Sequence, residues 1–174
     1  MRAHSRLELR PCIDLVTSYF TSGNQPPSHR WLDIVIGNSG EDNQLFIGDG
    51  SGGFTLHVLE GGERQTTAVA IGDVTGDSHL DIIVGNYEQA NQLLVGDGTG
   101  MFTAMDLVGG ANATRALAVG DVNGDGSLDL IIANSFQANQ LLVNDGSGNF
   151  TASDLEGGEL DTHAIALGDV TGDG

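Results

Sequence analysis

Short apolar segments separated by clusters of Gly, Asp, Asn and Ser dominate this chain. In the clearest stretch, one segment alternates polar and small apolar residues, and the next is an almost continuous aliphatic run, which is typical of a buried strand. Two further segments flank an Asp-Gly turn at Asp97, the kind of turn that joins the strands of a hairpin. The four segments are 66–74, 80–86, 91–97 and 101–107. The pattern predicts four short antiparallel strands, and it predicts no helix because glycine interrupts every longer stretch.

The same pattern returns at a fixed interval of 48 residues. Asp73, Asp121 and Asp169 show the step, because 121 − 73 = 48 and 169 − 121 = 48. The step also relates Asp33, Asp81 and Asp129; Asn43, Asn91 and Asn139; and Phe54, Phe102 and Phe150. A unit of this length cannot bury its apolar face alone, so the period predicts propeller blades or a solenoid. Four strands followed by a Gly-Gly link favour the propeller blade.

The fold class that we predict is all-β, with propeller blades that are four-stranded antiparallel sheets in an incomplete ring of about three blade equivalents. The predicted parts are a non-repeat, poorly ordered arm at 1–32, a partial blade at 33–59, whole blades at 66–107 and 114–155, and the first strand of a further blade at 162–170. The arm is either a genuine N-terminal segment or a sign that the chain is a piece of a longer array, and the interrupted motif at the C-terminus favours the second. A propeller closes with about four to eight blades, so open blade edges offer sites of self-association.

The charge balance excludes one class of partner. The chain has 24 acidic and 6 basic residues, a net charge of −18 at pH 7. Residues 33–174 hold only Arg64 and Arg115 against 22 acidic residues, a net charge of 2 − 22 = −20. Such a surface repels phosphate backbones and anionic membranes, so we expect no nucleic-acid partner. The carboxylates keep the protein soluble, bind cations, or do both.

The N-terminal region and the single cysteine say little about location. Cys12 is the only cysteine, so no disulfide can form within the chain. Residues 1–20 lack an apolar run long enough for a signal peptide, and no later stretch approaches the length of a membrane span. We therefore expect no membrane insertion by this segment.

The loop at 121–129 is the clearest candidate site. Its candidate ligands are Asp121, Asn123, Asp125, Ser127 and Asp129. Four of them offer side-chain oxygens, and Ser127 offers its backbone carbonyl. Ca²⁺ takes six to eight oxygen ligands at about 2.3–2.6 Å, so this set with one or two waters is a sufficient shell. Two carboxylates at about 4 Å repel each other by roughly 4 kcal/mol, so we expect the loop to need a cation in order to close.

Two further loops carry the same series with changes. Their candidate ligands are Asp73, Thr75, Asp77, His79 and Asp81 in the earlier loop, and Asp169, Thr171 and Asp173 in the later one. Ser78 stands where the clearest loop has Gly126, and His79 would bind through its carbonyl with the imidazole exposed. The later loop stops before its ninth position, so we expect weak binding there or none. Ion-free β-turns are the alternative for all three loops, but three copies in register favour a metal.

Calcium suits these loops better than other metals. Zinc is a poor fit because the loops lack Cys and His side-chain ligands. An EF-hand is also a poor fit, since Ile132 occupies the twelfth position, where a bidentate Glu belongs. Magnesium and manganese remain alternatives, and calcium is preferred because all donors are protein oxygens in a flexible glycine-rich turn. The other Asp-Gly pairs, at 49–50, 97–98 and 145–146, have too few convergent acids and are predicted to be plain hairpin turns.

The stretches GDVNGDGSLDLIIAN, at 120–134, and NQLLVNDGSGNFT, at 139–151, resemble the FG-GAP/VCBS repeat family. This family includes the integrin-like calcium-binding blades of integrin α-chain propellers and repeats of bacterial and algal surface proteins. The resemblance covers residues 33–174. It implies a β-propeller with calcium in the loops that join the first and second strands of a blade, which places calcium on the ligands named above for 121–129 and 73–81. The chain departs from the family pattern at Ser78 and at both ends.

The function that these features predict is a calcium-binding, non-enzymatic repeat segment of a larger cell-surface or secreted protein. Its parent would serve adhesion or would recognise a protein or glycan ligand through loops on the ring face. One alternative is a carbohydrate-binding, lectin-like propeller, although the sole tryptophan, Trp31, lies outside the repeats. Another is an accessory part of a propeller lyase or hydrolase, but His57, His79 and His163 belong to different units and no nucleophile motif is present.

Overall fold

The computed structural model describes residues 31–172, and within this range it contains eleven strands and no helix. Every strand pairing in this range is antiparallel. The predicted all-β class is therefore confirmed. The predicted arm at 1–32 lies outside the described residues except for Trp31 and Leu32.

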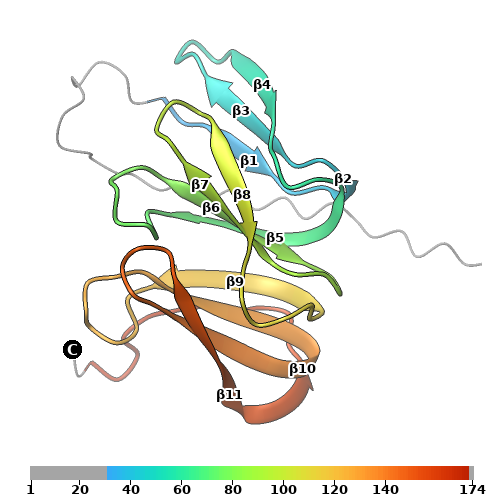
Figure 1. The fold of residues 1–174 in the computed structure, drawn as a ribbon, viewed down its shortest axis with the longest axis vertical. Coiled ribbons are helices and arrows are strands. Elements are labelled where there is room, and N and C mark those ends of the chain that lie inside the picture. Colours follow the sequence, from blue (N-terminus) through green and yellow to red (C-terminus); the bar gives the residue numbers. More distant parts are fainter. Residues whose placement is uncertain (1–30, 173–174) are drawn as a thin grey trace, which may run out of the picture.

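The strands form three sheets, one for each repeat. In chain order they are β1 (Ile34–Ile36), β2 (Ser39–Glu41), β3 (Gln44–Gly48), β4 (Phe54–Val58), β5 (Arg64–Gly72), β6 (Asp81–Asn86), β7 (Gln92–Gly96), β8 (Phe102–Asp106), β9 (Thr114–Gly120), β10 (Asp129–Asn144) and β11 (Phe150–Asp161). The sheet orders are β1-β3-β4, β2-β5-β6-β7-β8 and β11-β10-β9. Figure 1 shows the sheets stacked one after another in chain order, as the blades of an incomplete propeller. We call them the first, second and third blades.

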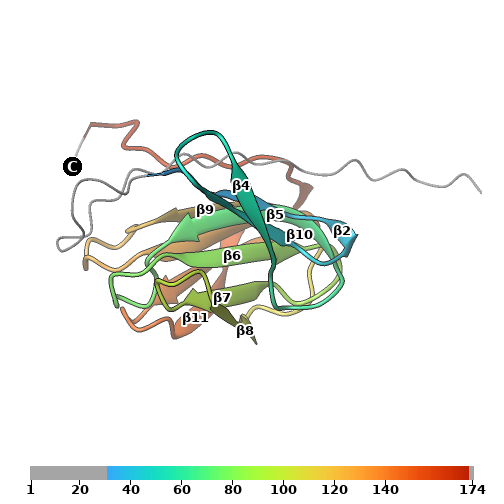
Figure 2. The ribbon, with the colours of Figure 1, turned by 90° about the horizontal axis from the view of Figure 1, so that it is seen from above.

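The second blade is the complete one. Its strands β5, β6, β7 and β8 lie side by side in chain order (Figure 2). One line of paired residues crosses the sheet, from Ile71 through Ile82 and Leu94 to Ala104. β6 is buried along its whole length, in agreement with its continuous aliphatic run.

The third blade has the same plan, although one strand label covers two of its strands. β10 pairs with β9 through its first six residues and with β11 through the rest. A straight strand of this length would hold its ends about 50 Å apart. Instead the ends meet, because the amide of Asn144 donates to Asp129 Oδ1 at 2.9 Å. β10 therefore folds back on itself, and Phe136 in the bend has a φ of 55°.

Apolar side chains on both faces of the second blade form the core. One cluster joins its Ala70, Val74, Ile83, Leu93 and Leu107 to Leu130, Ile132 and Leu142 of the third blade. The other joins its Val69, Ile82, Val84 and Leu94 to Val35, Leu45 and Leu59 of the first blade. Phe102 and Phe150 pack at the edges of these clusters, whereas Phe54, one period before Phe102, is 48% exposed. The core thus lies between sheets, as a stack of repeats requires.

A short pairing ties each blade to the segment that enters the next one. The tied pairs are Ser39 with Gln65, Tyr87 with Ala113, and Ser135 with Asp161. They are the same contact repeated at the 48-residue step. The third tie explains why β11 continues to Asp161 instead of ending at residue 155 as predicted, since the residues after the Gly-Gly link stay extended and pair with β10.

The predicted strand at 162–170 is not formed. Residues 162–169 have no strand pairing, although they repeat the sequence pattern of β5 and β9. A strand exists only with a hydrogen-bonded neighbour, and within the described range no second strand of a fourth blade is present to supply one.

Candidate metal centre

The first aspartate of each loop holds the loop backbone. Asp73 Oδ1 accepts the amides of Gly76 (2.7 Å) and Asp77 (3.2 Å), and its Oδ2 accepts the amide of Ser78 (2.9 Å). Asp121 makes the same three contacts one period later, at 2.7, 3.2 and 2.9 Å. The two loops therefore share one hydrogen-bonded conformation.

The fifth-position aspartate fixes the second half of the loop. Asp77 Oδ1 accepts the amide of His79 at 2.8 Å, and this hydrogen bond is the main reason that the pKa of Asp77 is lowered. Asp125 Oδ1 accepts the amide of Ser127 at 2.7 Å, which is likewise the main cause of the lowered pKa of Asp125. Both carboxylates are therefore ionised at neutral pH.

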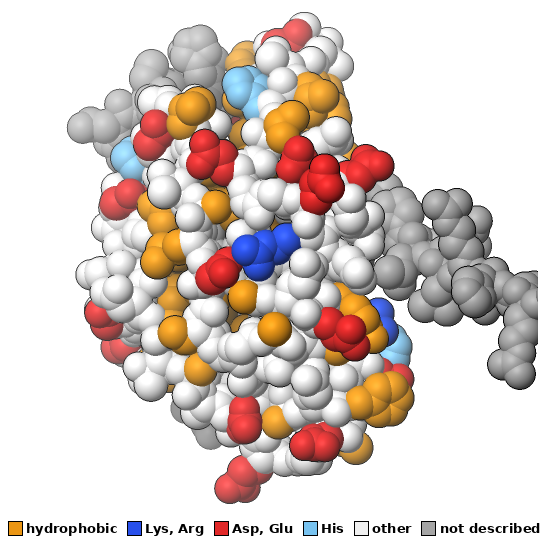
Figure 3. Space-filling model, turned by 45° about the vertical axis from the view of Figure 1, so that its right-hand side comes forward, with side chains coloured by type: hydrophobic (Ala, Val, Ile, Leu, Met, Phe, Trp, Pro, Cys, Tyr) orange, Lys and Arg blue, Asp and Glu red, His pale blue; other side chains and the backbone are white. Residues whose placement is uncertain are grey.

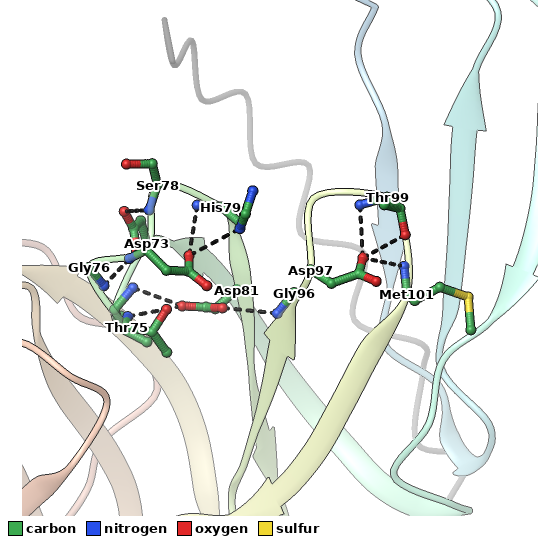
Figure 4. Close-up of polar contacts among 12 residues, drawn as sticks. Asp73, Thr75, Gly76, Ser78, His79, Asp81, Gly96, Asp97, Thr99 and Met101 are labelled. Carbon is green, nitrogen blue, oxygen red and sulfur yellow. Dashed lines mark hydrogen bonds and ion pairs between the residues drawn. The ribbon is translucent and has the colours of Figure 1, made fainter. Parts of the chain in front are cut away.

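The ninth-position aspartates are buried. Asp81 and Asp129 are both 0% exposed. Asp81 Oδ2 accepts the amides of Val74 (3.0 Å) and Thr75 (3.1 Å), and its Oδ1 accepts the amide of Gly96 (3.0 Å), as Figure 4 shows for Thr75 and Gly96. Burial raises the pKa of Asp81 against the lowering effect of these amides. No basic side chain within residues 31–172 pairs with either aspartate, so each carboxylate is held by neutral donors alone.

The third position differs between the two loops. Asn123 is exposed; its Oδ1 accepts the amide of Asp125 and its Nδ2 donates to Asp125 Oδ2, both at 2.9 Å. Thr75 Oγ1 is buried and makes no hydrogen bond of good geometry among the described residues, although it lies close enough to Asp77 and Asp81 to help lower the pKa of each. Buried hydroxyl groups are nearly always hydrogen-bonded. A buried hydroxyl without a well-formed hydrogen bond therefore has an oxygen that a ligand could contact.

The carboxylates of a loop do not converge on one point. Within the described range, no three Asp, Glu, His or Cys side chains are arranged to hold a metal ion. The amide hydrogen bonds above hold the loops in this conformation, and the expectation that closure needs a cation stays a prediction. The amides carry partial positive charge, which offsets the repulsion between the carboxylates.

The later loop begins in the same way. Asp169 Oδ1 accepts the amide of Gly172 at 2.6 Å and the hydroxyl of Thr171 at 3.4 Å. The first of these contacts matches the shortest contact of Asp73 and of Asp121. Asp173 lies outside the described residues, and its assignment as a ligand stays a prediction.

The repeats match one family along most of the chain. A family model described as FG-GAP-like repeat matches residues 29–84, 73–132 and 121–174, which together make up well over half of the sequence. The chain belongs to the FG-GAP-like repeat family. The resemblance seen in the sequence is thereby confirmed, and two of the matches begin at the first aspartates of the loops, residues 73 and 121. No curated protein matches the chain.

Each FG-GAP-like repeat also has a smaller aspartate turn. Asp97 Oδ1 accepts the amide and hydroxyl of Thr99 (2.8 and 2.7 Å) and the amide of Met101 (3.3 Å) in the hairpin between β7 and β8 (Figure 4). Asp49 and Asp145 cap the equivalent hairpins in the other two repeats. These are hairpin turns, as predicted.

The loop at 73–81 departs from its neighbour at two residues. Ser78 has a φ of 71°, a left-handed conformation that Gly126 adopts at the same position with a φ of 88°. The His79 side chain is exposed, as expected, and its Nδ1 lies 3.5 Å from Asp77 Oδ1. The imidazole therefore lies beside Asp77 and against Gly98 of the next hairpin.

The neighbouring repeat covers one loop and leaves the other open. Asn144 Nδ2 donates to the carbonyl of Val74 at 2.7 Å, and the carbonyl of Gly146 lies against Gly76. The loop at 73–81 thus packs against a hairpin of the third blade. In the loop at 121–129, residues 121–126 are exposed, so this loop is the more accessible to an ion.

The surface around the repeats is acidic. Figure 3 shows acidic side chains spread over one face and few basic ones. Arg64 is paired with Asp106 at 2.8 Å, and Arg115 lies over the Tyr87 ring at 4.8 Å. Residues 31–172 contain no helix long and apolar enough to cross a membrane.

Proposed function

We propose that this FG-GAP-like repeat array is a calcium-binding, non-enzymatic segment of a β-propeller that serves ligand recognition in a larger cell-surface or secreted protein. The observation that carries the proposal is the pair of loops at 73–81 and 121–129, which repeat the same aspartate contacts one period apart. A plain turn needs only one such aspartate, as the hairpin at Asp97 demonstrates. Each loop has three.

The chemistry of the loops suits a hard cation. Asp81 and Asp129 are buried without a basic partner, which is costly for a carboxylate unless a cation lies close by. The buried hydroxyl oxygen of Thr75, which lies beside Asp77 and Asp81, is a further ligand atom of the kind that calcium takes. Because each carboxylate oxygen can accept more than one contact, an ion can be added while part of the amide network is kept. Binding would exchange some amide contacts of the first and fifth positions for contacts to the ion.

The loop at 121–129 is proposed as the stronger site. Its ligands are Asp121, Asn123, Asp125, the carbonyl of Ser127, and Asp129. It is the more exposed loop, and its Gly126 adopts the left-handed turn without the strain that Ser78 carries. The bound ion would stabilise the hairpin between the first two strands of its blade and would take no part in chemistry.

Calorimetric titration with calcium tests the proposal. We expect at least one site, together with a melting temperature that rises with calcium and falls in chelator. Asp125→Asn should weaken binding about tenfold or more with little change in the metal-free fold, because the variant keeps one side-chain oxygen but loses the charge. Asp145→Asn is the matched control, since Asp145 caps a hairpin in the same blade without neighbouring acids. Unchanged affinity in Asp125→Asn, or an equal loss in Asp145→Asn, would contradict the assigned ligands.

The recognition role rests on the absence of any shared reactive cluster and on the repeat architecture. His57, His79 and His163 lie in different repeats of the described range, where they cannot form one acid-base site. Stacked repeats offer extended rows of loops, which suit binding to a protein or a glycan. Screening the calcium-loaded protein against extracellular protein and glycan panels tests this role, and turnover of a generic substrate that is lost in Asp121→Ala would contradict it.

A further inference from the structure

Two asparagines of the chain stand in the acceptor sequence for N-linked glycosylation, Asn-x-Ser/Thr. The two sequences are Asn-Ala-Thr at residues 112–114 and Asn-Phe-Thr at residues 149–151. An oligosaccharide on an asparagine is bulky and hydrophilic, so a folded protein can carry it only where that side chain opens to solvent. The structure separates the two asparagines on this point.

Asn149 ends the turn between β10 and β11, and both Asn149 and Thr151 are exposed. The position remains exposed where a blade lies on each side. Met101, one period before Asn149, is 61% exposed although the second blade packs against both the first and the third. The exposure of Asn149 is therefore a property of this turn in the repeat.

The hydrogen bonds of Asn149 leave a place for the sugar. Among the described residues, Asn149 Nδ2 donates one hydrogen bond, to Asp145 Oδ2 at 2.9 Å. The side-chain amide of asparagine has two N–H groups, and glycosylation replaces the hydrogen of one of them. One N–H remains after the transfer, so the contact with Asp145 can be kept.

Asn112 offers no such place. It is half-buried, and its Nδ2 donates to the carbonyl of Gly109 and to Gln140 Oε1, both at 3.1 Å. Thr114 is 0% exposed, and its hydroxyl donates to Asn134 Oδ1 at 3.1 Å. A sugar on Asn112 would remove one of two hydrogen bonds and would need space between the second and third blades.

We propose that Asn149 is an N-glycosylation site and that the folded protein carries no glycan on Asn112. This rests on the proposed function, which sets the protein at the cell surface or outside the cell. In the transfer, Asn149 Nδ2 attacks the anomeric carbon of an oligosaccharide that is carried on a polyprenyl diphosphate. A C–N bond forms, the C–O bond to the diphosphate breaks, the lipid diphosphate leaves, and a base of the transferase takes one Nδ2 proton. A chain that is still unfolded presents both asparagines, and folding then selects the product at Asn149.

The third repeat differs from its neighbours in the residue that makes the acceptor. The Phe-Thr pair after Asn149 recurs at residues 54–55 and 102–103, and Thr55 and Thr103 are exposed like Thr151. The residues before those pairs are Gly53 and Met101. The Phe-Thr pair thus belongs to the repeat, and the asparagine alone adds a glycan to the third blade.

The glycan would stand on the side of the loops at 73–81 and 121–129. A Cβ added at Gly148 would lie 3.1 Å from Thr75 Cγ2, and one added at Gly146 would lie 3.0 Å from Ser127 Oγ. Figure 1 shows the turn between β10 and β11 on the same side of the stack as these loops. The ties between blades lie at the other end of the strands, since β9 spans seven residues, about 20 Å. The glycan therefore leaves the side with the ties open to a ligand.

Secretion of the full chain from a eukaryotic cell line tests the proposal. A secretion leader placed before residue 1 supplies the compartment, so the result does not depend on where the protein naturally resides. We expect most molecules to exceed the 18.0 kDa chain mass by one oligosaccharide and to lose it on treatment with a peptide N-glycosidase. Release in heavy-oxygen water should label residue 149 and not residue 112. Asn149→Gln and Thr151→Ala should each abolish the added mass, and Thr103→Ala, at the matched position of the second blade, should leave it unchanged.

The glycosylated protein should melt within about 2 °C of Asn149→Gln, because the glycan displaces no packing contact. An unmodified Asn149, a glycan on Asn112 in molecules that melt cooperatively, or a melting temperature far below that of Asn149→Gln would each overturn the proposal. Chains that stay inside the cells are analysed in the same way, and retention of the glycosylated chain alone would also refute it. Calcium titration uses unglycosylated protein, so loss of the calcium site leaves the glycan result standing, and an unmodified Asn149 leaves the calcium result standing.

Discussion

The strain at Ser78 gives a sharp test of the loop geometry. Ser78 has a φ of 71°, and its amide donates to Asp73 Oδ2 at 2.9 Å, as the amide of Gly126 donates to Asp121 Oδ2 at the same distance. The Ser78 side chain is exposed, and Figure 4 shows its hydroxyl pointing away from the loop. Ser78→Gly therefore removes strain without removing a contact.

The size of the effect follows from two opposing terms. A left-handed conformation costs a residue with a Cβ about 1–2 kcal/mol. Glycine has more conformational freedom in the unfolded chain, so replacing Ser78 by glycine also destabilises the folded state by about 0.5–1 kcal/mol. Ser78→Gly should thus stabilise the protein by about 0.5–1 kcal/mol, a rise in Tm of about 1–4 °C for a chain of this size. Gly126→Ser should destabilise by a similar amount because it introduces the same strain one repeat later.

Thermal and urea unfolding in chelator measure both variants without any contribution from bound ion. The double variant should unfold close to the unaltered protein, because the two loops are separate sites whose effects add. A lower Tm for Ser78→Gly, or an unchanged Tm for Gly126→Ser, would refute the inference that the two loops share one backbone conformation.

Two further variants test the hydrogen bonds that hold the repeats. The hydroxyl of Thr99 is the main cause of the lowered pKa of Asp97. The stability that this carboxylate contributes is present above its unfolded-state pKa near 3.8 and is lost as the pH falls through its folded-state pKa. Asp97→Asn should therefore lower Tm at neutral pH. Below pH 3.8 the Tm of this variant should fall less steeply with pH than the Tm of the unaltered protein. Asn144 is buried and donates to the carbonyls of Val74 and Leu128 at 2.7 and 2.9 Å. Asn144→Ala should cost about 1–3 kcal/mol in urea unfolding, whereas the exposed Asn149→Ala in the same hairpin should change little.

The hydrophobic pattern predicted the strands well because it records which side chains must be covered. The aliphatic run at 80–86 became β6, which is buried on both faces, and the Asp-Gly turn at Asp97 became the hairpin between β7 and β8. The pattern also predicted a strand at 162–170, where none forms. Sequence periodicity identifies a segment that is able to be a strand, but hydrogen-bonded pairing depends on a neighbour that the segment itself does not contain.

The candidate loops were predicted from spacing, but the hydrogen bonds that shape them were not. The positions of Asp73, Asp77 and Asp81 came from spacing alone. The left-handed conformation of Ser78 was not predicted, although Ser78 stands where the other loop has Gly126. The hydrogen bonds from the amides were missed because backbone donors leave no trace in the sequence of side chains. The buried oxygen of Thr75 was also out of reach, since it depends on how the third blade covers the second.

The ties between blades bear on how such an array changes length. Each tie joins residues 26 positions apart, as in 65 − 39, 113 − 87 and 161 − 135, so it spans a boundary between successive blades but is shorter than one period. If one whole 48-residue period is duplicated or lost anywhere in the array, every remaining tie still joins the same two positions of the repeat. The number of blades can therefore change by one during evolution without loss of any tie, and only the geometry of the closed ring limits that number.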